Sequence, residues 1–270
     1  MKLLVLYLLG SITFLFFTSC EQKTKSSSSE NTLQLTEKEK EYAFLEQKIN
    51  EIDSLPENQT NVVRSLRWEK INNDVASSIE VAAVLDADGF PVKVVEYYAE
   101  GNMGKRGERK FYLEKEKIFA VAEIYDEWID SSTVNIIEQR TFFENENPVY
   151  AKQRSADYEV YLKDKPWVKI RPENKDISRA YSILSREGDF QPHFLSYIQG
   201  DDMLFLLLGE PKEENRYVTT VQVEKMNDFI ADLIKHKKEY KFRPMYIEFD
   251  IVGGKGTPEF RVLRKAEWID

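Results

Sequence analysis

The sequence contains very few of the residues from which disulfides and metal sites are built. Its 270 residues include one cysteine, Cys20, and two histidines, His193 and His236. A disulfide within the chain needs two cysteines, and a catalytic zinc site takes about three protein ligands. Neither histidine has a second histidine four residues away or lies in an H-E-x-x-H frame. We therefore predict that both histidines lie at the surface or at a rim, with no metal and no cofactor.

Sequence motifs for nucleophilic catalysis and for nucleotide binding are also missing. No G-x-S-x-G elbow occurs, and the glycine-rich segment 253–257 lacks the spacing and the hydroxyl of a phosphate loop. Segment 86–89, D-A-D-G, begins like a calcium loop, but no carboxylate lies where that loop would close. We interpret both segments as turns.

Basic residues are fewer than acidic ones: the chain has 38 lysines and arginines and 47 acidic residues, which give a formal net charge of −9. An acidic surface repels phosphate backbones, so we do not expect nucleic acid as a partner. The other fractions, 42% hydrophobic, 31% charged and 13% aromatic, are those of a globular protein. The length suffices for one large or two modest domains, each with its own core.

The amino-terminal residues have the layout of a secretion signal. A Met-Lys start is followed by sixteen uncharged residues, 3–18, and by small residues before Cys20. A transmembrane helix is the alternative, but it takes roughly 20 apolar residues to cross a bilayer. This run is shorter and is interrupted at Gly10 and Ser11. We predict a signal peptide over residues 1–19.

The quartet Phe17 to Cys20, F-T-S-C, resembles the lipobox of bacterial lipoproteins. The resemblance implies lipid attachment to the Cys20 sulfur, cleavage before it and acylation of the new amino terminus. One acyl chain anchors a protein only marginally, whereas two or more hold it firmly. We therefore interpret Cys20 as a membrane anchor, the alternative being a free thiol.

The long hydrophobic leader and the aromatic-rich body are similar to lipoproteins of the Bacteroidota. In that group, surface display is associated with several acidic residues after the cysteine, and here only Glu21 qualifies before Lys23 and Lys25. The resemblance thus implies the outer membrane, facing the periplasm. Residues 20–35 are polar and include four consecutive serines, so we predict a flexible tether with a span of roughly 20 Å.

The mature chain begins with a helical pattern. Thr36 and Glu39 form a capping box, and an apolar stripe follows at helical spacing and ends before Pro56. The stripe consists of Tyr42, Leu45, Ile49 and Ile52.

From about residue 67 to residue 170 the pattern becomes that of long strands joined by short turns, which predicts an antiparallel meander. The expected strands are 78–85, 92–99, 107–114, 117–128, 132–144, 148–153 and 157–162. Several are apolar on both faces, so the sheet has to be covered by helices, curl over a second layer or keep one face for a ligand.

Beyond Pro172 helices and strands alternate, and no internal repeat emerges. We expect helices over 177–184, 192–198 and 226–234, and strands over 203–208, 217–224, 246–252 and 259–268. The fold class predicted is α+β, a long antiparallel β-meander with an N-terminal helix followed by a smaller mixed β-β-α-β-β region. We place domains at 36–170 and 171–270, although one continuous domain fits equally well.

Two groups of side chains are candidate binding residues. Rings on a sheet can stack on sugars or line an apolar cavity, although they also fill cores. The candidate rings are Tyr97, Tyr112, Tyr125, Trp128, Phe143 and Trp167. Lys105, Arg106 and Arg109 lie among three glycines in an expected loop, where an anion could dock; the alternative is a hairpin tip with solvated charges.

Together these features predict a lipid-anchored cell-envelope protein that serves as a non-catalytic binding or accessory module. Its expected partners are the membrane, through the anchor, and a protein or a small apolar or glycan ligand. One alternative is a periplasmic carrier that holds an apolar molecule in a half-barrel. The other is a hydrolase that uses a pair of acids, drawn from residues such as Asp126, Glu127, Asp201 and Asp202.

Overall fold

The computed structural model describes residues 42–55, 61–72, 75–101, 104–129, 132–200, 203–212, 216–254 and 257–269. Several sequence predictions lie outside the described residues: the signal peptide, lipid attachment at Cys20, the tether, the capping box at Thr36 and Glu39, and the acids Asp201 and Asp202. They stay predictions.

The described residues are mainly β, with few helices and one large mixed sheet of fourteen strands. The strands are β1 (Asn61–Arg64), β2 (Trp68–Asn72), β3 (Val75–Leu85), β4 (Pro91–Glu100), β5 (Arg106–Glu114), β6 (Lys117–Trp128), β7 (Val134–Glu144), β8 (Asn147–Ala156), β9 (Val168–Ile170), β10 (His193–Gln199), β11 (Leu204–Gly209), β12 (Tyr217–Val223), β13 (Met245–Gly254) and β14 (Thr257–Trp268).

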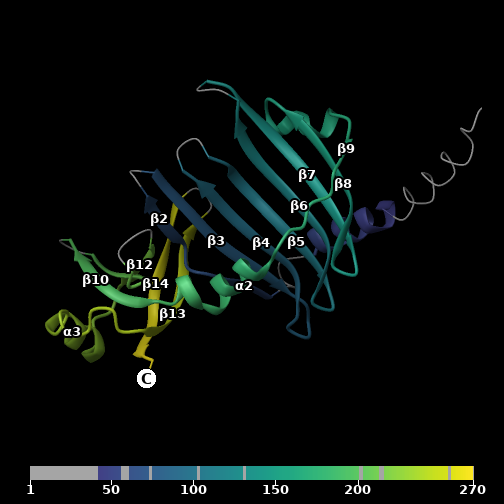
Figure 1. Ribbon diagram of the computed structural model, residues 1–270. Helices are drawn as coiled ribbons and strands as arrows, with labels where there is room; N and C mark the ends of the chain where they lie inside the picture. Colours follow the sequence, from purple (N-terminus) through teal and green to yellow (C-terminus); the bar gives the residue numbers. More distant parts are fainter. Residues whose placement is uncertain are drawn as a thin grey trace, which may run out of the picture. The chain divides into compact units, whose positions relative to one another are not determined.

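Strands β3 to β9 follow one another across the sheet in chain order, as a meander does, and Figure 1 shows β3 to β8 side by side. The other side of the sheet continues from β3 through β2, β12 and β11 to β10. β14 pairs with both β12 and β13, and its contact with β12 is parallel, which makes the sheet mixed. Strands from both sides of residue 171 therefore share one sheet.

The β5–β6 and β7–β8 hairpins repeat the same geometry thirty residues apart. Lys115 and Asn145 both have φ 49°, and Glu116 and Glu146 both have φ 66°. Two successive residues with positive φ are typical of a type I′ turn, whose twist matches that of the flanking strands. The register of each hairpin also shifts at the same place, between residues 112 and 113 and between residues 142 and 143. The sequence pattern did not reveal this repeat.

The two faces of the meander have different coverings. One face, which we call the core face, carries Phe111, Val121 and Tyr125 and belongs to the main hydrophobic cluster. Figure 1 shows α2 (Ser178–Ser185) lying over this face near β3 and β4. Buried residues of the C-terminal region, among them Leu206, belong to the same cluster.

The opposite face, which we call the helix face, is partly covered by a helix over residues 42–53. Tyr42 and Ile49 of that helix are 8% and 2% exposed and pack in a second cluster with Tyr112. At the other end of the helix, the Tyr112 hydroxyl donates to the Asp53 carboxylate across 2.9 Å. The helix therefore attaches to the sheet by apolar packing and by polar contacts.

Two of the expected elements are wrong. Residues 157–162 do not form a strand, because a 3-10 helix, η2 (Glu159–Asp164), begins there and buries only Leu162. The alternating apolar pattern fitted a strand, but the chain has left the sheet at Ala156. Residues 192–198 are not helical but form β10, since pairing with β11 overrides the helical start signal at Pro192.

The remaining helices are short. α3 (Asp228–Lys235) begins with an Asn227 side chain that accepts a hydrogen bond from the Ile230 N–H, and it buries Ile230 and Leu233. A 3-10 turn, η3 (Gly188–Phe190), precedes β10 and buries Phe190. No helix in the described ranges is long and apolar enough to cross a membrane.

Candidate functional site

A row of polar side chains crosses the core face of the meander from strand to strand. Glu96 on β4 is the register partner of Arg109 on β5, and Arg109 is the register partner of Glu123 on β6. The row continues through Gln139 on β7 to Gln153 on β8. Directly opposed charges of opposite sign stabilise neighbouring strands. We call the five residues of this row the polar ladder.

Arg109 bridges two buried carboxylates of the ladder. Its Nη1 lies 3.1 Å from Glu96 Oε2, and its Nε and Nη2 donate to Glu123 Oε1 across 3.2 and 2.7 Å. The side chains of Glu96 and Glu123 are only 1% and 5% exposed. The Tyr98 hydroxyl donates a further hydrogen bond of 2.6 Å to Glu123 Oε1.

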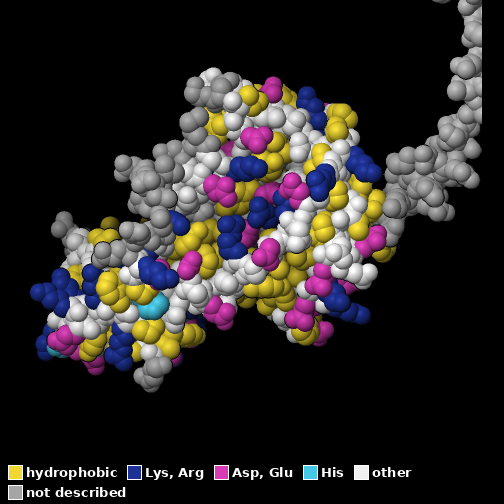
Figure 2. All heavy atoms as spheres, in the orientation of Figure 1, with side chains coloured by type: hydrophobic (Ala, Val, Ile, Leu, Met, Phe, Trp, Pro, Cys, Tyr) yellow, Lys and Arg dark blue, Asp and Glu magenta, His cyan; other side chains and the backbone are white. Residues whose placement is uncertain are grey.

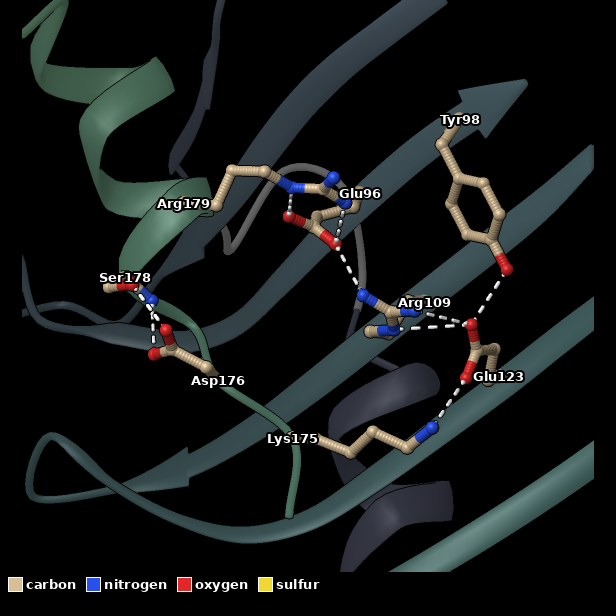
Figure 3. A network of polar contacts seen from close by, with 8 residues as sticks. All are labelled: Glu96, Tyr98, Arg109, Glu123, Lys175, Asp176, Ser178 and Arg179. Carbon is tan, nitrogen blue, oxygen red and sulfur yellow. Dashed lines mark hydrogen bonds and ion pairs between the residues drawn. The ribbon is translucent and has the colours of Figure 1, made fainter. Parts of the chain in front are cut away.

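Two cations approach the ladder from the segment that crosses the core face after β9. Arg179 of α2 holds Glu96 with two nitrogens, Nε at 3.3 Å and Nη2 at 3.2 Å. Lys175 donates to Glu123 Oε2 across 3.3 Å. Figure 3 shows both side chains reaching the ladder from this segment, opposite Tyr98.

The start of α2 is fixed by a side chain that precedes it. Asp176 accepts hydrogen bonds from the Ser178 N–H at 2.9 Å and from the Ser178 hydroxyl at 2.5 Å. These two hydrogen bonds lower the pKa of Asp176. Arg179, the next residue, is thereby held over Glu96 (Figure 3).

Arg109 and Glu123 stabilise each other in their charged forms. Burial alone would raise the pKa of Glu123, but hydrogen bonds from Arg109 and Tyr98 and the charge of Lys175 lower it below its ordinary value. Burial would likewise lower the pKa of Arg109, and the two carboxylates raise it. Burial, then the Glu123 charge, raises the pKa of Tyr98. A carboxylate held ionised and a tyrosine held protonated are poorly suited to proton transfer near neutral pH.

A pocket of about 240 Å³ lies beside the ladder, and we call it the ladder pocket. Its lining comes from four strands, β12, β2, β3 and β4, and from α2. The lining residues are Lys70, Ser77, Ser78, Ile79, Tyr98, Ala99, Glu100, Arg179 and Tyr217. Figure 2 shows charged side chains of both signs gathered over the middle of this side of the sheet.

A shallower groove runs along the helix face beside η2. It consists of two adjoining hollows, of about 410 and 670 Å³, that share Ile124 and Glu159. Tyr97, which is 45% exposed, lines the first hollow, and Glu138 and Arg154 line the second. A further pocket of about 380 Å³ lies between β12 and β14, next to the buried Arg261.

The six candidate rings do not converge on one site. Tyr125 and Phe143 are buried in the main cluster, and Tyr112 lies in the second cluster under the helix. Tyr97 and Tyr125 both line the hollow of about 410 Å³.

The two tryptophans among the candidate rings are half-buried. Trp128 lies at the end of β6. Three cations lie over the ring of Trp167, with Lys152 Nζ and the Arg154 guanidinium carbon both 4.5 Å from its centroid. Most of the candidate rings therefore contribute to packing within the protein, and Tyr97 is the one that is exposed.

The three candidate anion-binding residues are also separated. Arg109 is committed to the ladder carboxylates, and Lys105 lies over the Tyr125 ring with its Nζ 4.2 Å from the centroid. Arg106 lines the hollow beside Tyr97, with its backbone N–H donating to Asp126. The separate contacts of Lys105, Arg106 and Arg109 do not favour the predicted anion site, which stays a prediction.

Gly107 has a structural role between Tyr98 and Tyr125, its register partners on the two adjacent strands. A Cβ at this position would lie 2.1 Å from the Ile124 carbonyl oxygen and 2.7 Å from the Tyr125 Cα. Only glycine therefore allows β5 and β6 to approach this closely.

The two histidines and the D-A-D-G segment make hydrogen bonds within the protein. His193 lies in β10 and its Nδ1 is 3.0 Å from the Gln191 carbonyl oxygen. His236 ends α3, with Nδ1 2.8 Å from Asp232. The side chain of Asp86 accepts from the N–H groups of Asp88 and Phe90, which closes a turn. Within the described ranges, no group of three His, Cys, Asp or Glu side chains is placed to hold a metal.

The sequence contains a signal for the ladder that belongs to no known motif. Glu96 and Glu123 each stand among apolar residues in the middle of a strand, where a solvated charge would be out of place, whereas Arg109 lies between the charged residues Glu108 and Lys110. The alignment of Arg109 with Glu123 depends on the register shift in the β5–β6 pair, which the alternation of apolar residues does not reveal.

Comparisons with known proteins identify no relative of this chain. No protein-family model, no curated protein and no solved structure matches this chain. The site alone therefore carries the functional argument.

Proposed function

We propose that the chain is a non-catalytic binding or accessory module, held at the cell envelope by lipid on Cys20. The Glu96–Arg109–Glu123 bridge lies at the centre of the core face. This observation favours a binding module over a carrier or a hydrolase. The anchor itself is inferred from the resemblance of residues 17–20 to a lipobox.

A carrier of apolar molecules would need an apolar cavity between the sheet and its helices. The centre of this layer instead holds buried ionised groups, and hydrophobic side chains of the main cluster fill the space around them. The four pockets described above each contain charged side chains of both signs. Polar walls of this kind suit polar ligands or a protein surface better than a hydrocarbon chain.

A hydrolase that uses two acids would need one protonated and one free carboxylate beside a cleft. Glu96 and Glu123 are the most deeply buried carboxylates on this face, and each is tied to two cations. Of the acids named from the sequence, Asp126 accepts a backbone hydrogen bond from Arg106 and Glu127 is exposed. This arrangement favours a structural use of the acids.

The mass of the protein purified from its own host membrane tests the proposal. We expect a chain that begins at Cys20 and carries fatty acyl groups, without a retained apolar molecule under native conditions. The Cys20→Ala variant should lose the acyl mass and leave the membrane fraction. An intact leader joined to an unmodified thiol would refute the anchor, and a stoichiometric apolar ligand would favour a carrier.

A further inference from the structure

The ladder pocket is lined by a row of polar side chains parallel to the ladder. Tyr217 is the register partner of Lys70, Lys70 of Ser77, and Ser77 of Glu100. Four adjacent strands, β12, β2, β3 and β4, thus each contribute one of these side chains to the same pocket. Arg179 of α2 borders the pocket as well.

Several hydrogen-bond donors in this pocket are unused by the described part of the chain. The Lys70 ammonium has no ion pair there, and lies 5.3 Å from the centroid of the Tyr217 ring. The hydroxyl groups of Ser77 and Tyr217 have no hydrogen-bond partner among the described residues either. Polar groups that converge on a pocket without protein partners are free to bind a ligand.

Arg179 offers a further donor. It holds Glu96 through Nε and Nη2, and its Nη1 has no partner among the residues described. The side chain is 41% exposed, so this third nitrogen is not sealed in the core. A guanidinium fixed on one edge by a carboxylate is well placed to present its other donors to an anion.

The local charge balance is positive although the chain is acidic. Two buried carboxylates of the ladder face three cations, Arg109, Lys175 and Arg179. Lys70 adds another cation on the pocket side. Glu100 lies at the exposed rim, where it disfavours ligands with several negative charges.

We propose that the ladder pocket binds the oxyanion group of a small molecule, a carboxylate or a phosphate, between Lys70 and Arg179. The hydroxyl groups of Ser77 and Tyr217 complete the donors, and the Glu100 carboxylate accepts from an ammonium or hydroxyl group on the same ligand. The inference deepens the proposed binding role by naming a ligand class. Its test does not involve the lipid anchor, so the two proposals fail separately.

The test is the thermal unfolding midpoint of the full chain in detergent, with inorganic phosphate or acetate added against chloride at equal ionic strength. A ligand that binds only the folded state raises the midpoint in a saturable way. Phosphate also stabilises folded proteins by exclusion from their surface, but that effect does not saturate and is equal among variants.

Three variants make the test specific. Lys70→Gln should weaken the apparent affinity roughly tenfold, as expected for the loss of one charged hydrogen bond. Tyr217→Phe keeps the ring and should weaken the affinity less. The control is Lys237→Gln, because Lys237 also lies over a tyrosine ring, 5.1 Å from the centroid of Tyr197, but outside the pocket.

The outcomes are decisive. A saturable response in the wild type and in Lys237→Gln that is reduced in Lys70→Gln supports the proposal, and the relative response to acetate and phosphate tells which oxyanion the site prefers. Absence of a saturable response to either anion, or equal responses of Lys70→Gln and Lys237→Gln, would overturn it while leaving the anchored module intact.

Discussion

Arg109 is the residue on which the centre of the core face depends. Its guanidinium contacts both buried carboxylates, Glu96 and Glu123, across neighbouring strands. Taking such charges out of water is costly, and the cost is offset only while every partner is present. Removal of one member therefore harms the fold more than the net contribution of the ion pair would suggest.

We expect Glu123→Gln to lower the free energy of unfolding by about 3 kcal/mol, because the partly buried charges of Arg109 and Lys175 then lack a full counterion. Urea denaturation measures the change. The control is Glu127→Gln, an exposed acid on the same strand and the same face, which should change stability by less than about 0.5 kcal/mol. Equal effects of the two variants would contradict a structural role for the ladder.

The same carboxylate predicts a dependence of stability on pH. The pKa of Glu123 is lowered in the folded state, against about 4.3 in an unfolded chain. Its contribution is therefore fully present above the unfolded pKa and is lost as the pH falls through the folded pKa. Below about pH 4.3 the stability of Glu123→Gln should decline less steeply than that of the wild type. Parallel declines in a pH series of urea denaturations would exclude this linkage.

At the scale of helices, strands and turns, local sequence signals predicted some elements correctly and others wrongly. The turns at residues 115–116 and 145–147 were expected from sequence, and the structure has both turns between paired strands, although β8 already begins at Asn147. The expected strand over 157–162 and the expected helix over 192–198 were wrong because alternation and capping signals describe short segments only. Whether such a segment pairs with a neighbour is decided by tertiary contacts.

The β7–β8 turn offers a stabilising change. Glu146 has φ 66°, a left-handed conformation that costs most residues free energy and glycine very little. Glu146→Gly creates the Asn-Gly pair favoured in type I′ turns, and should raise the free energy of unfolding by about 0.5 kcal/mol. Glu144→Gly, at the exposed end of β7, should instead lower it. Denaturation midpoints that fall in both variants would contradict this assignment.

The helix over residues 42–53 is held by the side chains that face the sheet. Ile49 is 2% exposed, whereas Phe44 on the same helix is 64% exposed. Ile49→Ala should lower the free energy of unfolding by about 3 kcal/mol, and Phe44→Ala should change it by less than about 0.5 kcal/mol. Hydrogen exchange of the helix amides measures local detachment. Similar effects of both changes would mean that the helix does not dock through this stripe.

At the scale of the molecule, the question is whether residues 36–170 and 171–270 behave as separate domains. The described structure places residues 42–270 in one compact unit. β12 pairs with β2, and the main cluster mixes residues such as Val81 and Phe111 with Leu206 and Ile230. A core shared in this way couples the two regions.

We expect one cooperative unfolding transition, with coincident curves from far-ultraviolet circular dichroism and tryptophan fluorescence. Leu206→Ala, in the C-terminal region, and Phe111→Ala, in the meander, should each move the whole curve to lower denaturant, since both side chains are fully buried. Two separated transitions, with each variant affecting only one of them, would establish two domains.

The sequence by itself determined most of the meander, both short turns and the apolar stripe of residues 42–52, because each depends on spacing along a short segment. Of the α+β class predicted, the structure shows mainly strands with few helices. It also supplied the signal-peptide and lipid-anchor predictions, which rest on residues 1–20.

Only the tertiary structure decided which residues share a row across the strands, and hence that Arg109 pairs with Glu96 and Glu123 while Lys70 is left with unused donors. The physical reason is register. A shift of one residue after a turn sends every later side chain to the opposite face, and the β12–β2 pair that places Tyr217 beside Lys70 joins strands far apart in the chain.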